Sequence, residues 1–255
     1  MRRWLPEVLA LPLLPWLLVQ GRRTRRVTPR MPEAAGAREG LCLPAGAKDA
    51  WPVIEVLAIG ESPVAGVGVD TQDQAISARF AGQLAEQLQS AVRWTAFGKN
   101  GATVADALRD VTPQLPSRSI QIVLLAFGVN DSTAFHSSAR YRRDLGLLMQ
   151  TVRARLHPDL IIIAGVPPLH LFPALPQPLR HVLGMKAAVL NRAARQLAQQ
   201  SSKTIFVPIR SDTRDRSLMA HDGYHPSAAG VHMWAAQLAQ ATLNAFEKSK
   251  TEANA

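Results

Sequence analysis

Residues 120–131 read Ile-Gln-Ile-Val-Leu-Leu-Ala-Phe-Gly-Val-Asn-Asp, an apolar run that ends in a glycine and polar residues. Residues 160–163, which read Leu-Ile-Ile-Ile, form a second continuous apolar run. Strands covered by helices on both faces have this composition, whereas strands with one wet face alternate apolar and polar residues. The two runs therefore predict the centre of a parallel sheet.

Further strands and helices alternate on either side of this centre. Amphipathic stretches with apolar residues four apart lie between short apolar runs, which is typical of α/β proteins. The predicted strands are Val53–Ile59, Val92–Phe97, Ile120–Phe127, Leu160–Val166 and Thr204–Val207, and the predicted helices cover residues 76–88, 139–155, 185–197 and 227–246. This order predicts a parallel sheet with helices on both faces, whose ligands bind beyond the carboxyl ends of the strands.

Three short blocks stand directly after the first three predicted strands. The first, Gly60-Glu61-Ser62, places a serine hydroxyl and its backbone N–H at the edge of the sheet. In the second, Gly101 lets a backbone N–H approach a ligand closely at the start of a helix. In the third, Asn130 can donate its side-chain amide to a developing oxyanion. Each block by itself is more often an ordinary turn or helix cap.

The fourth block, residues 222–226 (Asp-Gly-Tyr-His-Pro), precedes the last predicted helix. Its spacing lets the Asp222 carboxylate reach Nδ1 of His225 and leaves Nε2 free to accept a proton from Ser62. Taken alone, such a pair is also typical of a metal-site fragment or a capped helix. Together the four blocks supply a nucleophile, a base, an acid that orients the base, and oxyanion donors from Ser62, Gly101 and Asn130.

In order and content these blocks resemble those of the SGNH (GDSL-like) hydrolases. The family's four letters fall on Ser62, Gly101, Asn130 and His225, and the match covers residues 53–246. The resemblance implies a flavodoxin-like three-layer α/β/α fold with a five-stranded parallel sheet in the order 2-1-3-4-5. It also implies a serine esterase that works through an acyl-enzyme and needs no cofactor.

Two residues depart from the family's pattern. Glu61 stands where the family usually has Asp, and Pro63 stands where it often has Leu. Neither change removes a catalytic atom, although Glu61 could alter how the nucleophile turn is braced.

The substrate class is predicted from the family resemblance and from one apolar loop. The resemblance points to lysophospholipase-like or short-acyl esterases acting on a small-molecule or lipid ester. Leu169, Phe172 and Leu175 lie among five prolines in the loop of residues 167–183, where apolar side chains would suit an acyl chain or serve ordinary packing. An acyltransferase and a carbohydrate deacetylase would use the same catalytic residues. From another class, an inactive membrane-tethered binding module is the remaining alternative.

Composition argues against several other classes. The net charge is +10, but residues 1–40 hold eight arginines against three glutamates and so carry half of it. No basic run with interleaved aromatic residues follows, so we expect no nucleic-acid binding. Cys42 is the only cysteine and no His, Asp and Glu residues have ligand spacing, so we expect no metal. Oligomeric state is left open.

Residues 1–26 are predicted to associate with a membrane. An apolar stretch, Val8–Val19, is interrupted by two prolines and followed by the arginine-rich residues 22–26. It is short for a span of about 20 residues, and no signal-peptidase site follows it. We expect it to span or to lie on the membrane with the body on the cytoplasmic side, the alternatives being export through an N-terminal signal and a helix packed on the domain.

The remaining organisation is predicted from composition. The proline- and glycine-rich residues 27–50 predict a linker, residues 51–248 the hydrolase domain, and residues 249–255 a disordered tail.

Overall fold

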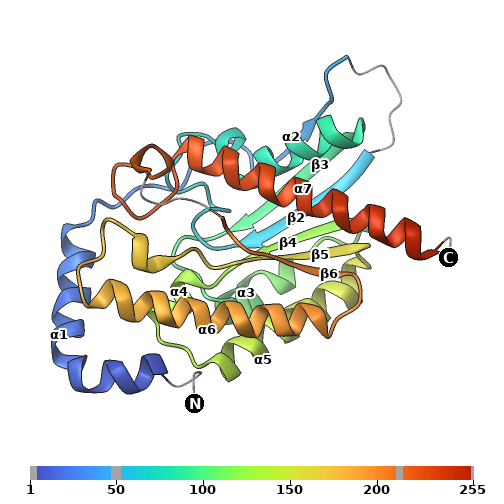
Figure 1. Cartoon of the computed structure of the whole chain (residues 1–255). Helices are drawn as coiled ribbons and strands as arrows, with labels where there is room; N and C mark the ends of the chain where they lie inside the picture. Colours follow the sequence, from blue (N-terminus) through green and yellow to red (C-terminus); the bar gives the residue numbers. More distant parts are fainter. Residues whose placement is uncertain (1–4, 47–52, 211–214, 254–255) are drawn as a thin grey trace.

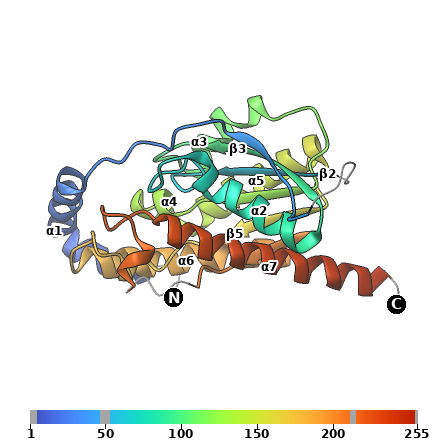
Figure 2. The ribbon, with the colours of Figure 1, turned by 90° about the horizontal axis from the view of Figure 1, so that it is seen from above.

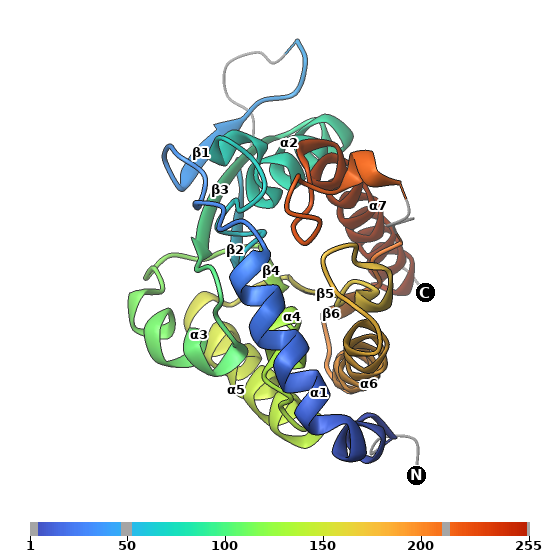
Figure 3. The same ribbon diagram turned by 90° about the vertical axis from the view of Figure 1, so that its left-hand side faces the viewer.

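A six-stranded sheet lies between two layers of helices (Figures 1 and 3). The computed structural model describes residues 5–46, 53–210 and 215–253, so the predicted domain start at residue 51 lies outside the described residues. The strands are β1 (Glu39–Cys42), β2 (Val53–Gly60), β3 (Ala91–Gly98), β4 (Ile122–Ala126), β5 (Leu160–Ala164) and β6 (Thr204–Val207), in the spatial order β1-β3-β2-β4-β5-β6. Strands β2 to β6 are parallel. The predicted parallel sheet and its strand order are thereby confirmed for these five strands.

The sixth strand, β1, corrects the predicted strand count. It pairs antiparallel with β3 and places Gly40 opposite Trp94, within the stretch predicted as a linker. A Cβ at Gly40 would lie 2.8 Å from Trp94 Nε1, so only glycine lets the strand lie against this indole. Strand β1 covers the outer edge of β3 and itself becomes an edge strand of the sheet.

The helices form two separate layers on the sheet. Helices α2 (Ile76–Leu88) and α7 (Ala228–Ala253) cover one face, and α3 (Val104–Asp110), α5 (Ser138–Leu156) and α6 (Leu179–Gln199) cover the other (Figures 1 and 3). Seen from above, α7 therefore lies in front of α6 (Figure 2). The chain also contains α1 (Leu5–Val27), α4 (Val129–Thr133) and the short 3-10 helices Gln72–Gln74, Thr112–Gln114, Leu169–Leu171 and Arg216–Leu218. The three-layer prediction is confirmed. Since α7 continues to Ala253, the predicted disordered tail from residue 249 is wrong for residues 249–253.

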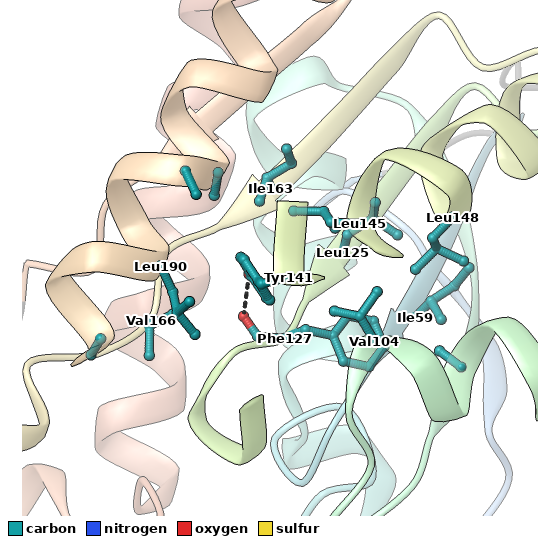
Figure 4. Packing of buried hydrophobic residues seen from close by; sticks show 14 of the residues in the cluster. Ile59, Val104, Leu125, Phe127, Tyr141, Leu145, Leu148, Ile163, Val166 and Leu190 are labelled. Atoms are coloured by element: carbon teal, nitrogen blue, oxygen red, sulfur yellow. Dashed lines mark hydrogen bonds between the residues drawn. The ribbon is translucent and has the colours of Figure 1, made fainter. Parts of the chain in front are cut away.

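The core explains why the strand runs are continuously apolar. In β4, Val123 and Leu125 face the α5 and α6 layer, whereas Ile122 and Leu124 face α2 and α7. Burying each such side chain contributes about 1.5–3 kcal/mol. Figure 4 shows the buried residues between the sheet and the α5 and α6 layer, where the Tyr141 hydroxyl donates to the Phe127 carbonyl at 3.1 Å. This bond fixes the end of β4, where the third sequence block begins.

The parallel register brings the strand ends to one level. Gly60 lies opposite both Gly98 and Ala126, and Ala126 lies opposite Ala164. A Cβ at Gly98 would lie 2.2 Å from Ala65 N, because the turn after β2 crosses directly over the end of β3. The loops that carry the first three blocks therefore emerge side by side.

The N-terminal helix α1 packs on α6 and contains two internal prolines. Figure 3, which views the molecule from the left-hand side of Figure 1, shows α1 running across the front toward α6. Among the described residues, no helix combines the length and the apolarity needed to cross a bilayer.

Candidate active site

Ser62 lies in the turn that follows β2, with only 7% of its surface exposed. Its carbonyl accepts a hydrogen bond from Val67 N at 2.9 Å, which closes the turn. Within the described parts of the chain, neither the Ser62 N–H nor the Gly101 N–H donates to a protein acceptor. Gly101 adopts a φ of +80°, a conformation that glycine allows without strain. Both N–H groups are therefore available to a ligand oxygen.

Asp222 and His225 form a closely held pair just before α7. Asp222 Oδ2 lies 2.6 Å from His225 Nδ1, and Oδ1 accepts the backbone N–H groups of Tyr224 at 2.9 Å and His225 at 3.0 Å. Burial alone would raise the pKa of Asp222, but the hydrogen bonds from His225 and Tyr224 outweigh it and lower the pKa below its ordinary value. The carboxylate is thus ionised at neutral pH and orients the imidazole, so Nε2 remains to act as a base.

Glu61 links the nucleophile turn to the loop after β4. Its Oε1 accepts Val129 N at 2.9 Å, and its Oε2 accepts Asn130 N at 2.9 Å and Asn130 Nδ2 at 2.6 Å. Burial of this carboxyl raises its pKa to about 8, although the three hydrogen bonds act in the opposite direction. Glu61, which stands where the family usually has Asp, therefore braces the first sequence block against the third.

The side chain of Asn130 has a fixed orientation. Besides Glu61, its Nδ2 donates to the Ala102 carbonyl at 3.1 Å, in the turn that contains Gly101. Two oxygen acceptors can be satisfied only by the NH₂ end of the amide, and both of its protons are engaged. To bind an oxyanion, the Asn130 amide would have to give up one of these two hydrogen bonds. The bond to the Ala102 carbonyl is the longer one. The oxyanion role of Asn130 stays a prediction.

Asp131, the last residue of the third block, has a structural role. It is fully buried, accepts Val104 N at 3.3 Å and lies 2.8 Å from His136 Nδ1. These contacts tie the start of α3 to α4. In the described ranges, no three His, Cys, Asp or Glu side chains are grouped so that they could hold a metal.

An apolar cavity of about 70 Å³ lies beside Ser62. Ser62 and His225 both line it, although no hydrogen bond joins them among the described residues. Its other walls include Phe172, Tyr224 and Trp234. The Tyr224 ring meets the Phe172 ring edge-on at 5.4 Å and the His225 ring at 5.3 Å. The His225 ring is thereby packed against the wall of the cavity.

The three apolar residues predicted to contact substrate have different positions. All three side chains are buried in the core, and of the three only Phe172 lines the cavity. Sequence reasoning missed Tyr224 and Trp234. Trp234 lies three residues after Val231 and four before Leu238, and this helical spacing indicates that it faces the sheet but does not indicate that it reaches the cavity.

The sheet order and these edge loops define a hydrolase of the SGNH-like fold. The pattern of the GDSL-like Lipase/Acylhydrolase family matches residues 58–233. The chain belongs to this family, and the resemblance stated from the sequence is confirmed.

Solved structures with similar folds include three esterases of different kinds. A lipase, Lip_vut3, from a goat rumen metagenome has 16% identity and a TM-score of 0.57, covering 72% of this chain and 95% of its own. Phospholipase A1 from Streptomyces albidoflavus has 18% identity and a TM-score of 0.54, covering 73% and 98%. A carbohydrate esterase family 2 enzyme from Corynascus thermopiles (Myceliophthora fergusii) has 17% identity and a TM-score of 0.59, covering 79% and 69%. The search of curated proteins finds no match.

Proposed function

We propose that this chain is a serine hydrolase that cleaves carboxylic esters of short acyl groups through an acyl-enzyme on Ser62. The observation that carries the proposal is the Asp222–His225 pair at 2.6 Å, whose imidazole lines the same apolar cavity as Ser62. Family membership supports the ester-hydrolase class. The N–H groups of Ser62 and Gly101, which donate to no acceptor among the described residues and lie at the same edge of the sheet, support an oxyanion site.

The residues divide the reaction into two steps. Ser62 Oγ attacks the ester carbonyl carbon while His225 Nε2 takes its proton, and the bond to the alcohol oxygen then breaks as His225 returns the proton to the leaving alcohol. Water attacks the acyl-serine in the second step, with His225 accepting its proton and returning it to Ser62 Oγ. Asp222 stabilises the imidazolium that forms in each step.

The size and lining of the cavity favour a short acyl group. Pockets for drug-sized ligands measure roughly 300–1,000 Å³, and this cavity measures about 70 Å³. The wall formed by Phe172, Tyr224 and Trp234 suits methyl and methylene groups. Acyl transfer and removal of acyl groups from carbohydrates would use the same first step, and analysis of the products distinguishes them from simple hydrolysis.

The nucleophile is tested by Ser62→Ala. We expect turnover of p-nitrophenyl acetate to fall by about 10⁴-fold or more, with unchanged circular dichroism. A fluorophosphonate probe should label the natural protein and fail to label the variant. Ser201→Ala, which changes a serine just after α6, is the matched control and should behave as the natural protein. Retention of more than about a tenth of the activity by Ser62→Ala contradicts the assignment.

The acyl preference is tested by Trp234→Ala. Removing this indole enlarges the cavity, so the optimum along a series of p-nitrophenyl esters should move to longer acyl chains. Phe80→Ala, which empties a fully buried site away from the cavity, controls for general destabilisation. An optimum that stays the same in Trp234→Ala would show that the acyl group binds elsewhere.

A further inference from the structure

The exposed side of α1 is unusually apolar. Of fourteen exposed large apolar side chains in the described part of the chain, ten lie on this one helix. The most exposed include Leu11 at 73%, Val8 at 64% and Trp16 at 58%. Scattered apolar residues are normal on soluble surfaces, but a concentrated group marks an interaction site. We call the exposed side chains of residues 5–19 the outer face.

The outer face belongs to a helix that is fixed to the domain. Gln20 Nε2 donates to the Gln177 carbonyl at 2.6 Å, and its Oε1 accepts Leu179 N at 3.1 Å. Lys186 of α6 is fully buried and pairs with Glu7. Without Glu7 the buried charge of Lys186 would be uncompensated, so this contact holds the helix in one position. The outer face is therefore presented in a defined orientation.

The C-terminal end of α1 is basic. Arg22, Arg23, Arg25 and Arg26 are all exposed, and none pairs with an acidic side chain among the described residues. An apolar stretch with leucine and tryptophan followed by arginines is the composition of helices that lie in a membrane interface. Each arginine close to an anionic lipid surface contributes to binding.

The basic end of α1 borders the active site. Gln20 contacts residue 177, in the loop that also supplies Phe172 to the cavity. Burial and Glu61 raise the pKa of Tyr224, and Arg25 partly offsets them, so the guanidinium acts on a residue next to His225. Figure 3 shows α1 on the same side of the molecule as the ends of β2 and β4.

We propose that α1 is a docking surface for an anionic lipid bilayer, on which it lies with its outer face among the headgroups and upper acyl chains. Leu11, Leu14 and Trp16 point in different directions around the helix axis, which a fluid lipid phase can surround more completely than a rigid protein surface. A second copy of this chain would bring the same arginines together on one face, and the net charge of +10 disfavours that pairing. Which side of a membrane carries the protein stays a prediction.

Vesicle flotation with the full-length protein tests the proposal without using ester hydrolysis, so it stands apart from the proposed function. The full chain should float with phosphatidylcholine vesicles that contain phosphatidylglycerol and bind pure phosphatidylcholine at least about tenfold more weakly. High salt should reduce binding to the mixed vesicles. Protein that stays at the bottom of the gradient at low salt, or binds both vesicles equally, overturns the anionic bilayer as partner.

Charge variants test the arginines. Arg22→Gln with Arg23→Gln should weaken binding to the mixed vesicles by roughly 30-fold. Arg79→Gln with Arg192→Gln, at exposed positions on other helices, is the charge-matched control and should weaken it by less than about threefold. Equal losses in the two double variants would show that only net charge matters and would remove α1 from the proposal.

Apolar variants test the outer face. Leu11→Gln with Leu18→Gln should weaken vesicle binding by about 10- to 100-fold, with unchanged thermal unfolding because both side chains are exposed. Leu43→Gln with Leu147→Gln is the control for exposed leucines elsewhere and should bind as the natural protein. If light scattering shows a dimer that the α1 leucine variant alone dissociates, the outer face is covered by a second copy and the proposal is wrong.

Discussion

Glu61→Gln should change how the stability of this protein depends on pH. The Glu61 carboxyl has a pKa of about 8 in the folded chain, against an ordinary value of 4.5. The folded state therefore holds this proton more tightly than the unfolded state does. The stabilisation is complete below pH 4.5 and is lost as the pH rises through 8. A difference of 3.5 pKa units corresponds to about 5 kcal/mol.

Urea unfolding of the natural protein and the variant from pH 4.5 to 9 measures this effect. Glutamine cannot ionise, so the unfolding free energy of the natural protein, relative to that of Glu61→Gln, should fall by roughly 4–5 kcal/mol over the range. In this difference, the pH dependence contributed by all other titrating groups cancels. Any pH-independent change in unfolding free energy caused by the substitution shifts the difference by a constant and does not alter its slope. Glu39→Gln, which alters an exposed glutamate on β1, should leave the curves parallel. If the unfolding free energies of the natural protein and Glu61→Gln run parallel with pH to within about 1 kcal/mol, the raised pKa of Glu61 is refuted.

Three further predictions concern catalysis. Asn130→Ala should lower kcat on p-nitrophenyl acetate by about 10²–10³-fold with a smaller change in KM; an unchanged kcat with a raised KM would make Asn130 a substrate-binding residue. Asp222→Asn should lower kcat by about 10⁴-fold because the amide no longer stabilises the imidazolium, and a loss below about tenfold would argue against the role of Asp222. Treatment with EDTA should leave hydrolysis unchanged, whereas activity lost in EDTA and restored by zinc would overturn the metal-free mechanism.

The parts of the fold that could be predicted from the sequence depend on local patterns. The apolar runs of β4 and β5 and the four-residue stripes of α2 and α6 are set by burial of neighbouring residues, so they can be read without tertiary information. Strand β1 could not be predicted, because its four residues show no alternation of apolar and polar side chains. They form a strand only by pairing with β3 and packing Gly40 on Trp94.

The candidate site divides in the same way. Ser62 and the Asp222–His225 pair lie in short motifs at element ends, so their proximity follows from the topology of a parallel sheet. The cavity wall could not be predicted in full, because whether Trp234 reaches the cavity that Ser62 lines depends on how α7 packs across the sheet. Leu169, Phe172 and Leu175 are all apolar and all buried, but only Phe172 lines the cavity, which composition alone does not distinguish.

The ion pair between Glu7 and the buried Lys186 joins residues separated by 179 positions, and this separation sets the order of events during synthesis. The ribosome adds about 5–20 residues per second, so α1 waits roughly 10–40 s before its partner on α6 exists. Throughout that interval the leucines of α1 and the arginines behind them are carried by a chain that cannot yet fold around them. Until residue 186 has been made, α1 therefore has no α6 to pack on, and its apolar side chains stay accessible for that whole interval.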